Sequence, residues 1–542
     1  MLCKVISAAL LGLDAFLVSV EVDQSPSVKV PRLLTVGLPD AAVKESRERV
    51  LAALKNSGHI IPMDNITINL APADQRKEGS GFDLPIAVGM LGVMADIHDL
   101  DTLQRVMILG ELSLDGLLRP IRGALSMAVA AREAGMESLV LPRQNANEAA
   151  VVESVAVYGM ETLREVVAFL NGGTAEPVRL NCRKLLEENS RYRTDFADVR
   201  GQSHTKRALE VASAGGHNVL MVGPPGSGKT MLARRIPTIL PPMTFDEAIE
   251  TTKIHSVAGI LRREEGLVGR RPFRAPHHTI SHAGLIGGGM VPRPGEVSLA
   301  HNGVLFLDEL PEFQRRVLEV LRQPMEDETV TISRAAMSLT FPARFTLVAA
   351  MNPCPCGYYG TERCQCSLPA VHQYMQRISG PLMDRFDIQI HVPAVAYRDL
   401  RTRSTGEASE FIRGRVCAAR ERQLERFREE GIFCNARMSS PMIRKHCVLD
   451  AEGETVLEKA VLEMGFSARA HDRILKVART IADLDGSETV SPSNVAEAVQ
   501  YRSLDRVVAN EVLLTRSNLG FEPLGGSSAG AFDRVPRSSF IR

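Results

Sequence analysis

The sequence has no net charge and few aromatic residues. Its 542 residues include 64 lysines and arginines and 64 aspartates and glutamates, which excludes a protein that binds nucleic acid through an overall excess of positive charge. A local basic channel is not excluded, because a neutral total can hide strong asymmetry. Tryptophan is absent and aromatic residues make up 5% of the chain, whereas hydrophobic residues make up 44%. This balance is typical of a soluble globular enzyme, and the length predicts about three or four domains.

No apolar run is long enough to span a membrane. The apolar stretch after Lys4 resembles a signal peptide only weakly, because Asp14 follows early and the hydrophobic pattern continues to Val22. We interpret this stretch as the first strand or two of a domain. The nine cysteines are an odd number, and with no export signal they favour a reducing compartment over a disulfide framework. A cytoplasmic protein is therefore expected.

The stretch GPPGSGKT at residues 223–230 fits the phosphate-binding pattern G-x-x-x-x-G-K-[ST] at every fixed position. Residues 219–222 precede it as a short apolar strand, and residues 231–236 follow as a predicted helix. At such a junction, backbone N–H groups and the helix N-terminus can hold phosphate oxygens. We expect Lys229 to reach the β- and γ-phosphates of ATP, and Thr230 to offer its hydroxyl to Mg²⁺. The expected nucleotide-binding residues are Gly223, Pro224, Pro225, Gly226, Ser227, Gly228, Lys229 and Thr230.

Two later apolar runs end in polar residues suited to ATP hydrolysis. Residues 304–307 lead into Asp308 and Glu309, as in a buried parallel strand that ends at the catalytic edge of a sheet. We expect Asp308 to join the Mg²⁺ shell and Glu309 to act as general base on the attacking water. Residues 345–351 form another predicted strand, and the Asn352 that follows can orient this water near the γ-phosphate.

Two arginines are candidates to stabilise charge on the γ-phosphate. Arg385 precedes a predicted fifth strand at 388–392 and is the candidate arginine finger, supplied to a neighbouring subunit. Such a residue is worth roughly 10³- to 10⁵-fold in rate, and a surface ion pair is the alternative role. Arg469 is expected to reach the γ-phosphate from the C-terminal helical region, with Arg473 as its competitor. An arginine supplied by a neighbour implies head-to-tail contacts, which form a ring if the rotation closes.

The hydrophobic periodicity divides the chain into α/β and all-α parts. Residues 1–172 alternate short apolar runs with amphipathic stretches and predict a mixed α/β domain. Residues 173–195 are predicted to be a linker. Residues 196–395 form the predicted α/β ATPase core with a parallel sheet, and residues 396–506 an all-α lid. The polar and glycine-rich tail at 507–542 is expected to be disordered.

Three stretches of the first domain resemble the proteolytic domain of Lon proteases: KEGSGFDLP (77–85), GELSLDGLLRPIRGALSMAVAAREAG (110–135) and LVLPRQNANE (139–148). That family uses a serine activated by a lysine. The position of this serine falls on Gly81, with Ser80 one residue out of register. The region of the lysine falls on residues 124–127, which contain no lysine. The resemblance implies a Lon-like α/β fold without the protease dyad, so proteolysis is not expected.

The order of phosphate loop, Asp-Glu strand, Asn-ended strand, finger arginine and lid arginine is similar to that of AAA+ ATPases. More narrowly, PFRAPHH…GLIGGG…PRPGE…LAHNGVLFLDE at 272–309 resembles the magnesium-chelatase branch. Further stretches extend a resemblance to the YifB/ComM family over residues 1–506: GLPDAAVKESRERV (37–50), APADQRKEGSGFDLPIA (71–87) and SARAHDRILKVARTIADL (467–484). The N-terminal domain of that family is likewise Lon-like without protease residues.

The family resemblance implies an ATP- and Mg²⁺-dependent homo-oligomer, a hexameric ring with single-stranded and branched DNA as partner and no membrane. ComM members are DNA helicases that drive branch migration and extend heteroduplex during natural transformation. The alternative is a chelatase-type motor that remodels a protein partner. Chelatase motor subunits usually lack a Lon-like domain in front, and this chain has one. An ATP-dependent protease is a third alternative, which the missing dyad disfavours.

The glycine- and proline-rich segment 272–303 cannot form a simple helix, and we predict loops or hairpins inserted into the core. In a ring, such loops can project into the central pore, and packing between subunits is the alternative role. Basic residues in and just before this segment are candidates to contact a phosphate backbone without reading sequence. They are Arg263, Arg270, Arg271, Arg274, His277, His278 and Arg293.

Four cysteines follow Asn352 with the spacing C-x-C-x₇-C-x-C: Cys354, Cys356, Cys364 and Cys366. Four thiolates, with turns permitted by Gly357 and Gly360, suit a tetrahedral structural Zn²⁺ site. The one-residue spacers are tighter than the usual two, so free or redox-active thiols are the alternative.

Overall fold

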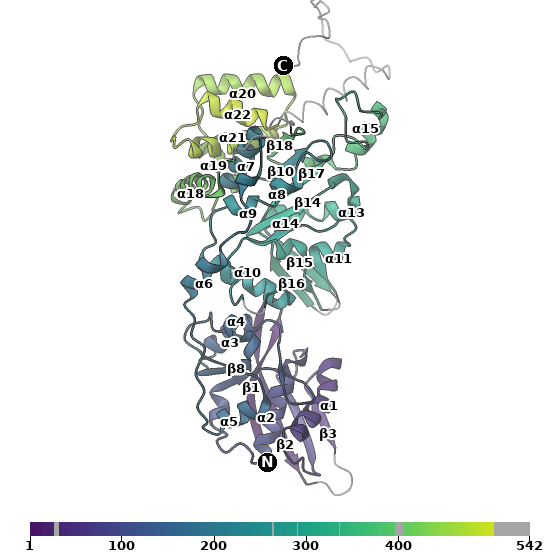
Figure 1. The fold of residues 1–542 in the computed structure, drawn as a ribbon, viewed down its shortest axis with the longest axis vertical. Helices are drawn as coiled ribbons and strands as arrows, with labels where there is room; N and C mark the ends of the chain where they lie inside the picture. Colours follow the sequence, from purple (N-terminus) through teal and green to yellow (C-terminus); the bar gives the residue numbers. More distant parts are fainter. Residues whose placement is uncertain are drawn as a thin grey trace, which may run out of the picture.

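The computed structural model describes residues 1–26, 32–77, 79–262, 265–289, 291–334, 337–395 and 406–502. The molecule is elongated, with the N-terminal domain at one end of its long axis and the C-terminal helices at the other (Figure 1). The ATPase core lies between them. The predicted tail at 507–542 lies outside the described residues, as does the start of the predicted lid at 396–405.

The N-terminal domain is built on a seven-stranded mixed sheet with the order β3-β4-β2-β1-β5-β8-β9. The first two strands form a long antiparallel hairpin, and the last three continue beside it as parallel strands. The strands are β1 (Leu2–Leu11), β2 (Asp14–Ser25), β3 (Leu33–Val36), β4 (Asn65–Ala71), β5 (Val106–Ile108), β8 (Ser138–Pro142) and β9 (Ala156–Met160), with a small hairpin of β6 (Glu111–Leu112) and β7 (Leu118–Arg119). This architecture confirms the predicted mixed α/β domain.

Helix α2 lies at the centre of this domain, because all of its residues are buried between the β1–β2 hairpin and α1. Two glycines permit the close approach. A Cβ on Gly89 would lie 2.6 Å from Val22 Cγ2, and one on Gly92 would lie 2.5 Å from Cys3 Sγ. The helices of the domain are α1 (Ala41–Asn56), α2 (Asp83–Val93), α3 (Ala124–Glu133), α4 (Arg143–Ala149) and α5 (Leu163–Leu170), with 3₁₀ turns η1 (Ser80–Phe82) and η2 (Thr102–Gln104).

The segment predicted as a linker contains a helix, α6 (Cys182–Asn189), capped by the side chain of Asn181. The side chain of Asn189 donates hydrogen bonds to the carbonyl oxygens of Glu265 (3.0 Å) and Leu267 (2.7 Å) in the ATPase core. Part of the predicted linker is therefore folded against the core.

The ATPase core is an all-parallel, five-stranded sheet with the order β11-β14-β17-β10-β18. Its strands are β10 (Val219–Val222), β11 (Phe273–Arg274), β14 (Gly303–Leu307), β17 (Phe345–Met351) and β18 (Ile388–His391). The predicted apolar strands are confirmed, and as expected of parallel strands they are buried. The surrounding elements are η3 (Phe196–Asp198), α7 (Ser203–Gly215), α8 (Lys229–Ala233), α9 (Ile236–Ile239), α10 (Phe245–Ala258), η4 (Leu310–Glu312), α13 (Arg315–Glu319), α14 (Arg322–Asp327), α15 (Leu368–Met375) and α16 (Gly380–Met383).

The helix after the phosphate loop is shorter than predicted. We expected one helix through residue 236, but α8 ends at Ala233 and α9 begins at Ile236. Pro237 explains the break, because it has no N–H to donate to the carbonyl of Ala233 and its ring would clash there.

The segment 272–303 contains a small hairpin, β12 (Gly287–Gly288) with β13 (Arg293–Pro294), and two short helices, α11 (His282–Ile286) and α12 (Glu296–Leu299). The predicted hairpin is present, and the short helices are additional. A second hairpin, β15 (Thr329–Arg334) with β16 (Met337–Pro342), lies next to it, since Nε of Arg334 donates to the carbonyl of Gly289 at 3.3 Å.

The predicted all-α C-terminal region is confirmed: α18 (Ser409–Arg426), η5 (Asn435–Arg437), α19 (Ser440–His446), α20 (Ala451–Met464), α21 (Ala468–Leu484) and α22 (Pro492–Gln500). Helix α21 has a buried apolar face made of Ile474, Val477, Ala478 and Ile481. These residues belong to the same hydrophobic cluster as β10 and α7. The lid is therefore packed onto the core.

The N-terminal domain packs against the core, where Leu267 and Val268 belong to one of its hydrophobic clusters. Glu148 on α4 is buried and accepts hydrogen bonds from the backbone of Leu125 (2.8 Å) and from the hydroxyl of Ser256 on α10. Burial raises the pKa of Glu148, and these hydrogen bonds partly offset the shift. The turn between β1 and β2 reaches the second hairpin, because a Cβ on Gly12 would lie 3.3 Å from Leu339.

Candidate active site

The phosphate loop connects β10 to α8 as predicted. Gly226 (φ 76°) and Gly228 (φ 87°) have the left-handed conformation that glycine adopts without strain. Gly223 is required for a different reason, since a Cβ there would lie 2.1 Å from the carbonyl oxygen of Val392. Nζ of Lys229 donates to the carbonyls of Gly223 (2.6 Å) and Pro224 (3.0 Å), inside the curve of the loop. Burial lowers the pKa of this ammonium group.

The polar residues at the carboxyl ends of three strands meet at one edge of the sheet. The hydroxyl of Thr230 donates to Asp308 Oδ2 at 2.6 Å, which brings together the two residues predicted to hold Mg²⁺. Asn352 Oδ1 lies 3.3 Å from Nζ of Lys229. A hydroxyl and a carboxylate oxygen are ligands that suit Mg²⁺, so this donor set fits the metal.

Glu309 has a left-handed backbone conformation (φ 52°), which is uncommon outside glycine and occurs often at functional sites. Its side chain is 58% exposed. Its carboxylate lies 3.4 Å from Nδ1 of His278, which belongs to the inserted segment. We expected His278 to be a candidate DNA contact, and sequence reasoning did not find its position beside Glu309. The two are far apart in sequence, so only the fold brings them together.

Arg385 lies at the opposite edge of the sheet from the phosphate loop of its own chain. β18 runs parallel to β10, with Val219 opposite Ile388 and Val222 opposite His391. Arg385 precedes the amino end of β18, whereas the loop follows the carboxyl end of β10. At about 3.3 Å per residue, the two edges are more than about 10 Å apart. Arg385 donates to the carbonyl of Pro381 and pairs with Glu326.

Arg469 lies near Arg385 and away from its own phosphate loop. Its side chain is 71% exposed and pairs at 3.7 Å with Asp384. A cavity of about 260 Å³ is lined by both arginines together with other charged residues: Glu326, Asp387, Arg437, Asp472, Arg473 and Lys476. None of the described residues that line it belongs to the phosphate loop. We expected Arg469 to reach the γ-phosphate from the lid; its exposed side chain instead lies at this edge of its own chain, beside the cavity that it shares with the buried Arg385.

Arg473, the competitor of Arg469, is an internal ion-pair residue. Its guanidinium lies 2.7 Å from Asp387, which is buried and also accepts from the backbone N–H of Asn218 (3.1 Å). Burial alone would raise the pKa of Asp387, but the charge of Arg473 and the hydrogen bond from His217 outweigh it and hold this pKa far below its ordinary value. The pair joins α21 of the lid to the residue that directly precedes β18 of the core.

Replacement of Arg473 by alanine is expected to destabilise the protein by about 3 kcal/mol, because it leaves the buried Asp387 without its counter-charge. Arg469→Ala is the matched control on the same helix, and its exposed side chain predicts a change below about 1 kcal/mol. Chemical unfolding of both variants measures the difference. Because folding lowers the pKa of Asp387, its contribution is present above the unfolded pKa of about 4 and is lost at lower pH. Equal stabilities of the two variants would contradict this assignment.

Several basic residues before and within the inserted segment are held inside the fold. Arg271 donates to the carbonyls of Pro241 (2.5 Å) and Asn302 (2.8 Å), and Arg274 forms a two-bond ion pair with Glu296 (2.6 and 2.7 Å). Nε of Arg270 donates to the carbonyl of Asn189. His277 and Arg293 are exposed, and Arg263 lies outside the described residues. Of the described candidates for contact with DNA, these two exposed side chains are the most accessible.

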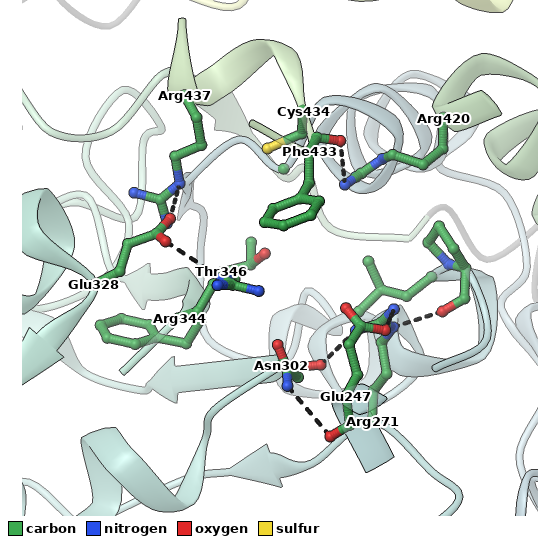
Figure 2. Close-up of a pocket in the computed structure, with 15 residues that line it drawn as sticks. Glu247, Arg271, Asn302, Glu328, Arg344, Thr346, Arg420, Phe433, Cys434 and Arg437 are labelled. Atoms are coloured by element: carbon green, nitrogen blue, oxygen red, sulfur yellow. Dashed lines mark hydrogen bonds and ion pairs between the residues drawn. The ribbon is translucent and has the colours of Figure 1, made fainter. Parts of the chain in front are cut away.

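A second cavity, of about 90 Å³, lies between the core and the lid (Figure 2). Phe433 points into it, and Arg344 stacks on this ring at 4.8 Å. Arg344 and Arg437 both pair with Glu328, and the half-buried Arg420 donates to the carbonyls of Ser213, Ala214 and Phe433. Because the arginines that line this cavity bond to other groups of the protein, we interpret it as part of the packing between core and lid and not as part of the nucleotide site.

The four cysteines form a compact cluster directly after Asn352. Cys354 Sγ lies 3.3 Å from Cys356 Sγ and 3.9 Å from Cys364 Sγ, and all four sulfur atoms lie within 4.8 Å of one another. Backbone N–H groups of Gln365 and Tyr358 hydrogen-bond the Cys356 sulfur and, with Cys354, lower its pKa to about 6. Backbone N–H groups also reach the sulfurs of Cys364 and Cys366, but burial and the neighbouring cysteines raise the pKa of both thiols, that of Cys366 to about 11. The backbone hydrogen bonds to Cys356 favour its thiolate, the form that binds metal.

The serine and lysine that lie near the Lon serine position, Ser80 and Lys77, each have another partner. Ser80 donates its hydroxyl to the carboxylate of Glu111, and Nζ of the buried Lys77 donates to the carbonyl of Pro72. Neither contact is the serine–lysine pair on which that protease mechanism depends.

Comparison with known proteins covers both halves of the chain. Residues 195–400 match the family described as magnesium chelatase, subunit ChlI; residues 20–145 match subunit ChlI of Mg-chelatase, and residues 406–502 match its C-terminal part. Competence protein ComM of Haemophilus influenzae is 45% identical over 94% of this chain and 98% of its own. The uncharacterised protein YifB of Escherichia coli is 43% identical over the same shares.

The chloroplast magnesium-chelatase subunit ChlI of Nicotiana tabacum is more distant, at 23% identity over 58% of this chain and 74% of its own. Among the described residues, no helix has the length and apolar character needed to cross a membrane. With the fold, the phosphate loop and the full-length similarity together, the chain belongs to the YifB/ComM family of magnesium-chelatase-like AAA+ ATPases.

Proposed function

We propose that this protein is a hexameric, ring-forming ATPase that couples ATP hydrolysis to movement along DNA and promotes branch migration in recombination during natural transformation. The observation that carries the proposal is the position of Arg385 and Arg469 at the sheet edge opposite the phosphate loop. A site with its phosphate-binding residues on one edge and its candidate arginines on the other is complete only when a second copy docks.

The first edge supplies binding and hydrolysis. Lys229 and the loop amides hold the phosphates, and Thr230 and Asp308 hold Mg²⁺, which neutralises phosphate charge when bound. Asn352 lies beside Lys229 and orients the attacking water, and Glu309 accepts its proton. The second edge supplies Arg385, whose buried Nε has no hydrogen-bond partner among the described residues. In the next subunit, this arginine stabilises charge that develops on the γ-phosphate.

DNA as the substrate is supported by a relative and by the inserted segment. ComM of Haemophilus influenzae is named a competence protein, and competence is the capacity to take up DNA. The hairpin that carries the exposed Arg293 lies against the second hairpin, β15–β16. Hairpins paired in this way in every subunit would line the pore of a ring with positive charge, which binds a phosphate backbone irrespective of sequence.

The test is ATPase activity with and without single-stranded and forked DNA, together with DNA affinity over a range of salt concentrations. We expect stimulation by DNA and an affinity that falls steeply with salt, because binding releases counterions. Arg293→Ala is expected to weaken binding and flatten this dependence, while Arg143→Ala, an exposed residue of the N-terminal domain, leaves both unchanged. Absence of stimulation and of salt-sensitive binding would contradict a DNA motor.

The alternative is a chelatase-type motor that remodels a protein partner. The similarity to the chloroplast chelatase subunit favours it, although that similarity covers 58% of this chain. An ATPase that ignores DNA would favour this second function.

The cysteine cluster is proposed to hold one Zn²⁺. Four sulfurs bound tetrahedrally at about 2.3 Å lie about 3.8 Å from one another. The separations among the sulfurs of Cys354, Cys356 and Cys364 are 3.3, 3.7 and 3.9 Å, close to that value and far from a disulfide bond of about 2.0 Å. The Cys366 sulfur lies within 4.8 Å of the other three.

A further inference from the structure

The cysteine cluster lies against the ATP site, and this contact has a consequence for hydrolysis. The loop 354–366 begins two residues after Asn352, and its Gly357 packs on the phosphate loop. A Cβ on Gly357 would lie 2.5 Å from Cδ of Pro225 and 3.9 Å from Cγ of Asn352. The loop therefore touches both the phosphate loop and the residue proposed to orient the attacking water.

The far end of the loop returns to Asn352. The loop continues into α15, and the backbone N–H of Asn352 hydrogen-bonds the hydroxyl of Tyr374 on that helix. Tyr374 is buried, and burial raises its pKa to about 12. Asn352 thus lies between the cysteine loop on one side and α15 on the other, so the closure of the loop determines where its side chain stands.

Few interactions within the loop itself stabilise its closed conformation. Of residues 354–366, only Cys354 and Gly357 are buried, and the loop has no apolar core. Its internal backbone bonds are those of short turns, such as Gly357 N to Cys354 O (3.0 Å) and Cys364 N to Thr361 O (3.1 Å). For such a segment, metal binding supplies the folding free energy.

We propose that Cys354, Cys356, Cys364 and Cys366 hold a divalent metal ion, and that this ion has a structural role: it keeps Asn352 and Pro225 in the positions needed for ATP hydrolysis. Four thiolate ligands favour zinc as the metal. The inference rests on the proposed ATPase function and assigns a role to the metal within it. The metal does not touch the nucleotide. Its loss lets the loop move off the phosphate loop, and a displacement of about 1 Å at a reacting centre costs up to about 100-fold in rate.

The sharpest test separates metal binding by the cysteines from the packing of Gly357 on the phosphate loop. Gly357 (φ 87°) and Gly360 (φ 84°) have the same left-handed conformation in the same loop, but a Cβ at Gly360 meets nothing within 4 Å. Both alanine variants carry the same backbone strain and keep all four cysteines. We expect Gly357→Ala to retain one zinc per chain, measured by elemental analysis, and to lower kcat for ATP at least about tenfold. Gly360→Ala is expected to retain both zinc and kcat.

The metal itself is tested by removal. A zinc-selective chelator in excess Mg²⁺, or the double variant Cys364→Ser/Cys366→Ser, is expected to lower kcat at least about tenfold, while a fluorescent ATP analogue still binds. Added Zn²⁺ is expected to restore kcat for ATP in the chelator-treated protein. Cys182→Ser, at a half-buried cysteine outside the cluster, is the control that keeps zinc and activity. A fully active protein without zinc, or equal activities of the two glycine variants, would contradict this structural role of the metal.

Asn352→Ala distinguishes this failure from failure of the proposed site. If Asn352→Ala hydrolyses ATP normally, the role of Asn352 is wrong, whatever the metal does. If Asn352→Ala is impaired while the zinc-free protein is fully active, the proposed role of Asn352 in hydrolysis is supported and the structural role of the metal is wrong.

Discussion

Glu309→Gln is expected to bind ATP and to assemble normally, but to hydrolyse ATP at least about 100-fold more slowly. Glu309 follows Asp308 at the carboxyl edge of the sheet, and its carboxylate is exposed enough to accept a proton from water even with His278 beside it. Glutamine has the same length and can still hydrogen-bond, but it cannot take up that proton. Steady-state release of phosphate measures the loss, and binding of a fluorescent ATP analogue shows that the nucleotide site is intact.

Glu312→Gln is the matched control. It is the same exchange three residues further along, at a carboxylate that pairs with Arg377 at 3.0 Å. It is expected to hydrolyse ATP normally. If Glu309→Gln also turned over at the normal rate, another group would have to be the base.

Arg385→Ala is expected to lower the rate of ATP hydrolysis by about 10³-fold while leaving ATP binding unchanged. The side chain is 10% exposed in the single chain, and it pairs with Glu326 at the edge opposite the phosphate loop. Its loss therefore removes nothing from the nucleotide site of its own subunit. The effect appears only where this edge meets the phosphate loop of a neighbour.

Mixing two inactive variants tests whether the arginine acts between subunits. Lys229→Ala lacks a competent nucleotide site but keeps Arg385, and Arg385→Ala has the reverse defect. A ring formed from both contains some junctions with an intact site facing an intact arginine, so mixing is expected to restore part of the activity. No recovery in rings shown by size to contain both chains would contradict an arginine supplied by a neighbour.

Local sequence was sufficient wherever a residue's role follows from its immediate neighbours. The phosphate loop needs glycines at fixed positions between a strand and a helix, and Gly226 and Gly228 have the backbone conformation that this requires. Asp308 and Asn352 each follow an apolar strand, and parallel strands bring such ends to one edge. The break at Pro237 also follows from the sequence, because proline interrupts a helix interior.

Pairing between distant residues was not predictable in this way. Arg271 and Arg274 are as basic as Arg293 in the sequence, yet both are bound inside the fold. The helix in the predicted linker owes its position to contacts of Asn189 with residues far along the chain. A single sequence contains no signal for these partners, since a hydrogen bond depends on where two segments meet and not on their composition.

The sequence by itself determined the chemical groups of this protein: a nucleotide loop, the acids and the amide proposed for hydrolysis, candidate arginines and a set of four thiols. Each of these is set by residue type and short spacing. Only the tertiary structure decided which edge of the sheet each group occupies. Arg385 lies at the amino end of β18, and Arg469 on α21 lines the same cavity. Because β18 runs parallel to β10, this end is opposite the phosphate loop, which follows the carboxyl end of β10. The cysteine loop lies on Pro225 because β17 and β10 are neighbours, and adjacency of strands is a property of the folded sheet.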